Sequence, residues 1–135
     1  MVSSDDLAAV PLFSSLDEVQ LARLADWFHV QNTSEGVTLV GEGAPGYTFF
    51  ILVGGTAAVT TAGETVALLG PGDFFGEIAI LGDGRRTATV MSTSPVRLLV
   101  MFGTEFRRLE GDHPEIASQI AEAMRARAGQ IAELA

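Results

Sequence analysis

A glycine-rich stretch at residues 70–90 holds the side chains of this sequence that are best suited to bind an anion. It opens with the turn sequence Gly-Pro-Gly-Asp at 70–73, and residues 77–81 then lie between two glycines, Gly76 and Gly82. Residues 77–81 have room for about one helical turn, which leaves most of its backbone N–H groups without internal partners. Such N–H groups at a helix start attract anions. The stretch therefore predicts an anion site.

The charged residues of the stretch narrow down the chemistry of that anion. Arg85 and Arg86 follow the short turn, and they are the only arginines between Arg23 and Arg97 in a sequence without lysine. A guanidinium matches two phosphate oxygens at once. Glu77 would repel a phosphate, so its carboxylate is better suited to accept hydrogen bonds from neutral hydroxyls. Together these groups predict a sugar phosphate as the ligand.

Each of these residues also has an ordinary structural interpretation. Gly76 and Gly82 could be turn residues, Glu77 could be a solvated carboxylate, and the two arginines could be gatekeepers in front of a β-strand. Any one of these readings is reasonable for a single residue. We favour the binding interpretation because all of the features occur together and in register.

The order and spacing of these residues resemble the phosphate-binding cassette of cyclic nucleotide-binding domains, the family typified by cyclic AMP receptor proteins. The family pattern is F-G-E-hydrophobic-A-hydrophobic, a short variable loop and R-[ST/A]-A-[TS]. This sequence reads FGEIAIL at 75–81 and RTAT at 86–89. Arg85 precedes the position of the matching arginine, and we interpret it as a loop residue.

The resemblance implies a role for each matched residue. Glu77 would accept a hydrogen bond from the ribose 2′-hydroxyl, and Arg86 would pair with the cyclic phosphate. Backbone N–H groups around Ile78, Ala79 and Ala88 would hold the phosphate oxygens. The ligand-binding residues that the resemblance implies are Gly76, Glu77, Ile78, Ala79, Arg86, Thr87 and Ala88.

Thr87 bears on the choice of nucleotide. The resemblance implies that its hydroxyl contacts the phosphate, and in the family a threonine after the arginine is associated with tolerance of cyclic GMP. We expect cyclic AMP (cAMP), because compact members of the family usually bind it, and cyclic GMP (cGMP) stays open. Beyond this ligand we expect no cofactor and no metal.

The expected fold is mainly β with flanking α: an antiparallel β-barrel or jelly roll (double-stranded β-helix) with N-terminal helices and a C-terminal lid helix. We expect a single domain over residues 1–135, with a helical N-terminus at 1–32, a barrel at 33–102 that carries the cassette at 70–90, and C-terminal helices at 103–135. Many short strands with frequent glycine turns indicate the barrel. The expected strands are 37–40, 48–53, 56–61, 65–69, 86–91 and 96–101.

Local signals place the helices and one hairpin. Apolar residues spaced by three and four predict a helix through residues 21–28, capped by Ser15 or Asp17. Ala-Gly-Glu at 62–64 predicts a hairpin connection. Thr104 is the expected cap of a helix at 105–109, and Pro114 is expected at the first position of the last helix.

The last helix carries an apolar stripe that Gly129 interrupts. It is expected to pack on its own barrel, and in the family it is a lid that moves over the base of the nucleotide. The candidates to cap the base are Met124, Arg125 and Arg127, an arginine by stacking on the face of the base. A solvated surface position is the alternative for either arginine.

Composition excludes several classes of function. A net charge of −9 argues against binding to nucleic acid or to anionic lipid. The absence of cysteine excludes thiol catalysis and disulfides. His29 and His113 have no metal-ligand spacing near them, so we interpret both as ordinary residues of helical regions. No membrane span and no secretion signal is expected, which favours a cytoplasmic location.

These observations predict a regulatory cyclic nucleotide sensor. Binding would move the C-terminal helix and control a fused effector domain or a partner protein, and a homodimer is possible. The alternative is an interaction or dimerisation module that keeps the fold without a ligand. We do not expect an enzyme, because the sequence offers no nucleophile with a base, no metal set and no paired carboxylates.

Overall fold

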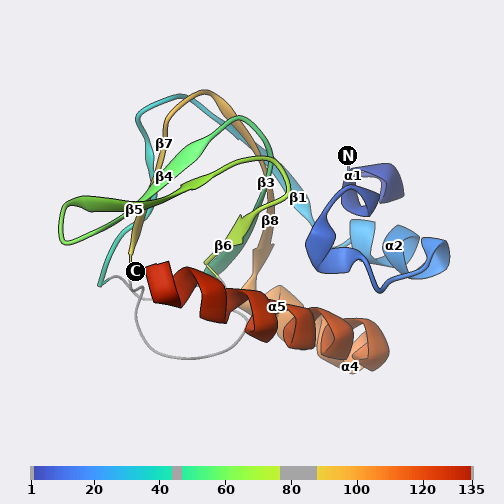
Figure 1. Cartoon of the computed structure of the whole chain (residues 1–135). Coiled ribbons are helices and arrows are strands. Elements are labelled where there is room, and N and C mark those ends of the chain that lie inside the picture. The colour runs from blue at the N-terminus through green and yellow to red at the C-terminus, as the bar shows by residue number, and fades with distance from the viewer. Residues whose placement is uncertain (1, 44–46, 77–87, 135) are drawn as a thin grey trace.

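The computed structural model describes residues 2–43, 47–76 and 88–134, with side chains in the last helix described up to residue 126. Within these ranges the strands form two four-stranded antiparallel sheets, with helices at both ends of the chain (Figure 1). This confirms the expected mainly β fold with flanking α-helices. The two sheets pack as layers, and the described strands do not join them into one closed hydrogen-bonded barrel.

The first sheet has the strand order β1-β8-β3-β6 and the second has the order β2-β7-β4-β5. The strands of the first sheet are β1 (His29–Thr33), β8 (Val96–Phe102), β3 (Thr48–Gly54) and β6 (Phe74–Phe75). The strands of the second are β2 (Thr38–Val40), β7 (Thr89–Ser92), β4 (Ala57–Thr61) and β5 (Glu64–Leu69). Each sheet thus combines strands from both sides of the cassette segment.

The helices begin and end at recognisable signals. They are α1 (Ser4–Ala8), the 3-10 helix η1 (Pro11–Phe13), α2 (Glu18–Ala25), α4 (Gly103–Asp112) and α5 (Pro114–Leu134). Asp17 caps α2 by accepting a hydrogen bond from the Gln20 N–H at 2.9 Å. Pro114 opens α5, as predicted. Among the described residues we find no helix with the length and hydrophobicity that a membrane span requires.

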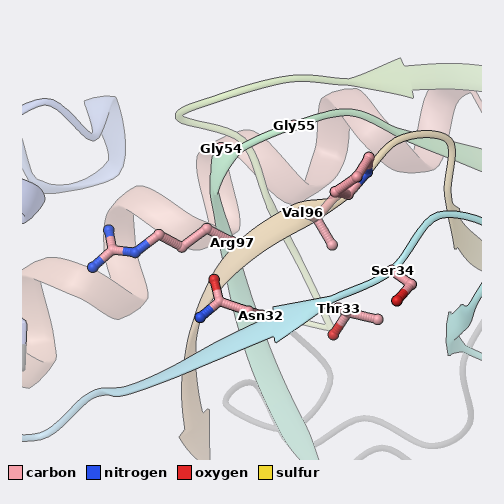
Figure 2. A pocket seen from close by; sticks show the side chains of 8 residues that line it. Asn32, Thr33, Ser34, Gly54, Gly55, Val96 and Arg97 are labelled. Carbon is pink, nitrogen blue, oxygen red and sulfur yellow. The ribbon is translucent and has the colours of Figure 1, made fainter.

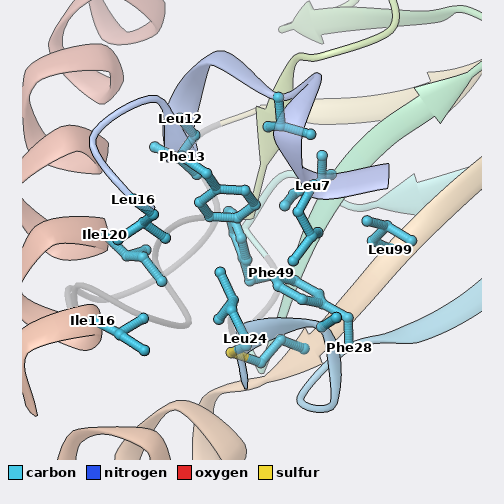
Figure 3. Close-up of a cluster of buried hydrophobic side chains, with 14 of the residues drawn as sticks. Leu7, Leu12, Phe13, Leu16, Leu24, Phe28, Phe49, Leu99, Ile116 and Ile120 are labelled. Carbon is cyan, nitrogen blue, oxygen red and sulfur yellow. The ribbon is translucent and has the colours of Figure 1, made fainter. Parts of the chain in front are cut away.

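Two apolar clusters lie on opposite faces of the first sheet. Along β8, Leu99 and Met101 face the cluster that also contains residues of each described helix, here called the helical cluster. Leu98 and Val100 face the cluster between the two sheets, here called the inter-sheet cluster. Figure 3 shows the helical cluster, in which the ring centroids of Phe13 and Phe28 lie 6.0 Å apart. Burial on both faces explains why β3 and β8 read as continuous apolar runs.

The structure corrects two local predictions and adds one strand. Residues 29–33 form strand β1 and not the end of a helix, because they pair with β8 from His29 opposite Val100 to Thr33 opposite Val96. β6 was not predicted. α4 begins at Gly103 and Thr104 does not cap it, because the Phe102 N–H donates to Glu105 Oε1 at 2.9 Å. α5 is continuous through Gly129, the residue that interrupts its apolar stripe.

Both histidines lie outside helices. His29 belongs to β1, and its Nε2 is 2.8 Å from Glu105 Oε2, so this contact ties the first sheet to α4. His113 is the residue between α4 and α5, where its N–H donates to the Leu109 carbonyl at 2.7 Å. Both residues therefore have structural positions at element boundaries.

Candidate functional site

The turn that leads into the cassette is fixed by hydrogen bonds at both of its ends. The Gly70 N–H donates to Asp73 Oδ2 at 2.8 Å, and the Asp73 N–H donates back to the Gly70 carbonyl at 3.1 Å. The Gly72 N–H and the Asp73 carbonyl both bond to the backbone of Leu52 on β3, at 2.7 and 2.8 Å. The turn therefore sets where β6 begins relative to the sheet.

The two phenylalanines of β6 anchor the start of the cassette on both clusters. Phe75 stacks on Phe50 at 4.9 Å in the inter-sheet cluster, and Phe74 lies 5.8 Å from Phe49 in the helical cluster. Gly76 follows, buried and with φ +77°, a conformation that glycine adopts at little cost. The Phe-Gly pair of the sequence pattern therefore has a structural explanation: Phe75 packs in the inter-sheet cluster, and Gly76 takes a positive φ that glycine adopts easily.

The end of the cassette returns to the same place. Ala88 packs against the inter-sheet cluster, which also contains Phe75. The chain then continues as β7, where Thr89 pairs with Thr60 on β4 and Val90 pairs with Val40 on β2. The structure thus brings Phe75 and Ala88, which stand on either side of the predicted contact residues, to one apolar cluster between the two sheets, and Gly76 is buried directly after Phe75.

The other predicted cassette residues lie outside the described residues. These are Glu77, Ile78, Ala79, Arg86 and Thr87, together with Arg85. Their roles toward a ligand stay predictions. The described part of the site is its frame: the turn at 70–73, β6, Gly76 and the start of β7.

The three candidates to cap the base have different surroundings. Met124 is fully buried in the helical cluster, so the structure does not bring it to the inter-sheet cluster where Phe75 and Ala88 lie. Arg125 is exposed and lines a shallow hollow of about 280 Å³ beside Glu110 and Glu122. Arg127 belongs to α5, and its side chain is outside the described residues.

A wider hollow of about 540 Å³ lies at one end of the first sheet (Figure 2). Its polar lining includes Asn32 and Arg97, which are cross-strand neighbours on β1 and β8. Arg97 Nη1 lies 3.8 Å from Asp6 Oδ1 and so faces α1. The lining contains none of the cassette residues, so this hollow is separate from the predicted nucleotide site.

Sequence reasoning missed one contact of the cassette frame. A Cβ added to Gly72 would lie 3.2 Å from Pro11 Cδ, so the turn before the cassette packs against η1. The two residues are far apart in the sequence, and no local pattern marks their contact. The described residues also hold no group of three or more His, Asp or Glu side chains arranged to bind a metal ion.

The fold and the frame of the site define a class of protein: a two-sheet β-domain with helices at both ends of the chain, whose sequence carries the FGE and RTAT motifs. The family model for the cyclic nucleotide-binding domain matches residues 30–113. This chain therefore belongs to the cyclic nucleotide-binding domain family.

The similar proteins include kinase regulatory subunits and gated channels that are much longer than this chain. A cAMP-dependent protein kinase regulatory subunit of Hypocrea atroviridis is 37% identical over 105 residues, which is 78% of this chain and 23% of the relative. A cyclic nucleotide-gated potassium channel of Rhizobium etli is 33% identical over 123 residues, which is 91% of this chain and 34% of the channel. The matched part of this chain thus spans about a quarter of the regulatory subunit and about a third of the channel.

Solved structures give the same fold. A cAMP-bound PfPKA-R fragment (141–441) is 25% identical, with a TM-score of 0.74 over 93% of this chain and 46% of that chain. The N-terminal domain of a transcriptional regulator from Streptomyces coelicolor is 27% identical, with a TM-score of 0.79 over 94% of both chains. The CBD2 domain of PKAR with Sp-2Cl-cAMPS, at 22% identity and a TM-score of 0.84, supports the fold.

Proposed function

We propose that this chain is a regulatory sensor that binds cAMP in its cassette and relays binding through its C-terminal helices. The observation that carries the proposal is the position of Gly76 and Ala88. Gly76 is buried directly after Phe75, a member of the inter-sheet cluster, and Ala88 packs against the same cluster, so the two described ends of the FGE and RTAT segment are fixed by one group of apolar residues. A family match over residues 30–113 accompanies this geometry.

The ligand contacts follow from the cassette pattern. Arg86 pairs with the cyclic phosphate, and Glu77 accepts a hydrogen bond from the ribose 2′-hydroxyl. N–H groups around Ile78, Ala79 and Ala88 hold the phosphate oxygens, because backbone donors and a guanidinium are both well suited to phosphate. Thr87 adds a phosphate contact and keeps cGMP as a second ligand.

The relay has a continuous set of contacts in the described residues. The turn before the cassette packs on Pro11 of η1, and η1 contacts α5. The Ser15 hydroxyl, just after η1, donates to Gln119 Oε1 of α5 at 2.9 Å. A ligand moves α5 only through a difference in affinity for two arrangements of these elements. Met124 would have to leave the helical cluster to cap a base, whereas Arg125 is already exposed.

The effector that this domain would regulate is inferred from its relatives. The named relatives are a kinase regulatory subunit and a gated channel, in which the matched region is a minor part of the protein. We propose that this domain likewise controls a fused effector domain or a separate partner protein, and that the domain itself is regulatory and not catalytic. A cytoplasmic location and a homodimer stay predictions.

Calorimetric titration of cAMP into the chain and into Arg86→Ala tests the assignment. Arg86→Ala should weaken binding by roughly 2–5 kcal/mol, the cost of removing one partner of a close charge pair. Arg85→Ala is the matched control, since it removes a neighbouring arginine that the pattern does not use, and its affinity should stay near that of the unmodified chain. Equal affinity of Arg86→Ala and the unmodified chain would contradict the proposal.

Two further titrations separate the ligands and the rival function. Thr87→Ala should lose more affinity for cGMP than for cAMP, and equal losses would remove Thr87 as a selectivity residue. Millimolar cAMP or cGMP should raise the melting temperature of the chain by mass action. A melting temperature that neither nucleotide changes would favour an interaction module without a ligand.

A further inference from the structure

Thr89 is held from both sides at the point where the chain leaves the cassette. Its backbone pairs with Thr60 of β4 on one side. On the other side, backbone pairing between β2 and β7 ends at Val40 and Val90. Beyond that pair, the Thr89 side chain makes the next contact between the two segments: its Oγ1 accepts a hydrogen bond from the Glu42 N–H at 2.9 Å.

Glu42 makes a second contact, to the tip of the β4–β5 hairpin. Its Oε1 accepts a hydrogen bond from the Ala62 N–H at 3.0 Å. Ala62 has φ +52°, a left-handed conformation that is unusual for a residue with a side chain. Glu42 therefore joins three segments: the chain just after β2, the start of β7 and the hairpin tip.

We infer that Thr89 is a positioning residue for the nucleotide phosphate, and that Glu42 is its anchor. The inference rests on the proposed function, in which Arg86 pairs with the phosphate. Thr89 is only three residues after Arg86 and directly follows Ala88. Fixing Thr89 on two sides limits where the preceding guanidinium and N–H groups can lie, and such placement matters because charge-assisted hydrogen bonds are directional.

A merely structural interpretation is that the Thr89–Glu42 bond closes the end of a sheet. The two interpretations differ in what they predict for nucleotide affinity when the fold is kept. A structural bond changes the free energy of unfolding, whereas a positioning bond also changes the dissociation constant, and only in a chain that has Arg86.

The test is a double-mutant cycle measured by calorimetry with cAMP. Thr89→Val should weaken binding roughly three- to tenfold, because it removes a hydrogen bond of ordinary strength. Thr89→Ser keeps the hydroxyl and should bind within about twofold of the unmodified chain. In the Arg86→Ala background, Thr89→Val should cause no further loss. Thr60→Val, a threonine directly opposite Thr89 on β4, is the matched control and should leave the affinity unchanged.

Amide hydrogen exchange on the unmodified chain gives a second test that does not depend on a variant folding. The Glu42 N–H should exchange slowly, and rapid exchange would show that the bond to Thr89 does not form and would overturn the inference.

The outcomes of the cycle separate this inference from the proposed function. If Arg86→Ala binds as well as the unmodified chain, the proposed function fails and this inference fails with it. If Arg86→Ala loses affinity and Thr89→Val does not, only the inference is overturned. An equal loss from Thr89→Val with and without Arg86 would likewise overturn it, because Thr89 would then act independently of the guanidinium.

Discussion

Gly72 packs directly against Pro11: a Cβ on Gly72 would lie 3.2 Å from the Pro11 Cδ. This contact joins the turn before the cassette to η1, the 3-10 helix that also contacts α5. The N-terminal segment therefore contacts both the turn before the candidate binding site and the C-terminal helix α5.

Gly72→Ala should lower the free energy of unfolding by about 1–3 kcal/mol. The residue has φ +98°, which strains a side-chain-bearing residue, and the new methyl group would press on a rigid proline ring. Gly36→Ala is the control, since Gly36 has φ +81° and open space around it. Urea denaturation of both variants should show the larger loss for Gly72→Ala, and equal losses would mean that the Pro11 contact adds nothing.

Ala62→Gly should raise the free energy of unfolding by about 0.5–1 kcal/mol. Ala62 and Gly63 both have positive φ, +52° and +82°, as a two-residue hairpin turn requires. Glycine removes the strain at the first position and keeps the N–H that donates to Glu42. Ala58→Gly, in the middle of β4, is the control and should be destabilising. A lower melting temperature for Ala62→Gly would show that the turn carries no strain there.

The sequence anticipates this hairpin and most of the other strands because they follow local signals. Glycine turns flank the apolar runs, and the observed bounds of β3, β4, β5 and β8 agree with the expected strands to within a residue or so. The sequence also singled out the Phe-Gly pair at 75–76 through the family resemblance, but the burial and positive φ of Gly76 came only from the structure.

Strands that depend on distant partners could not be predicted. β1 has the sequence His-Val-Gln-Asn-Thr, and it becomes a strand because β8, which lies far away in the sequence, pairs with it. β6 is only two residues long and exists because β3 offers partners for Phe74 and Phe75. The contacts of Gly72 with Pro11 and of Thr89 with Glu42 are likewise tertiary, so no local pattern could identify them.

Asp6 should stabilise the fold at neutral pH and lose this effect in acid. Its pKa is lowered, first by the hydrogen bond that the Ser3 N–H donates to Oδ2 at 2.9 Å, against an opposing effect of burial, and further by the Ser3 hydroxyl and the charge of Arg97. A lowered pKa in the folded state means that the stabilisation is present above the ordinary value of 3.8 and is lost as the pH falls through the folded value.

The check is thermal denaturation of the unmodified chain and Asp6→Asn between about pH 6 and pH 2. Asn keeps an acceptor for Ser3 and removes the charge, so the difference in melting temperature should be constant near pH 6 and should shrink below about pH 4. Asp5→Asn removes a carboxylate from the same first turn of α1 and serves as the control. A difference that does not change with pH would mean that the charge of Asp6 contributes nothing.

The fluorescence of Trp27 should report any movement of the junction between α4 and α5. It is the single tryptophan of the sequence, it is partly buried, and it packs at the edge of the helical cluster. Its ring lies 6.4 Å from His113 in an edge-on arrangement, and the guanidinium of Arg108 lies 6.0 Å from its centroid. Any displacement of the α4–α5 junction therefore changes the surroundings of the indole.

Titration with cAMP should change the fluorescence emission of Trp27, with the same midpoint that calorimetry gives for binding. Arg108→Ala removes the cation from the ring, so it should alter the emission of the free chain and change the dissociation constant by no more than about fivefold, because an exposed cation–π contact is worth about 0.5–1 kcal/mol. If calorimetry shows binding while the emission stays constant, the α4–α5 junction does not move. The relay would then have to act through another contact of α5, such as its contact with β5.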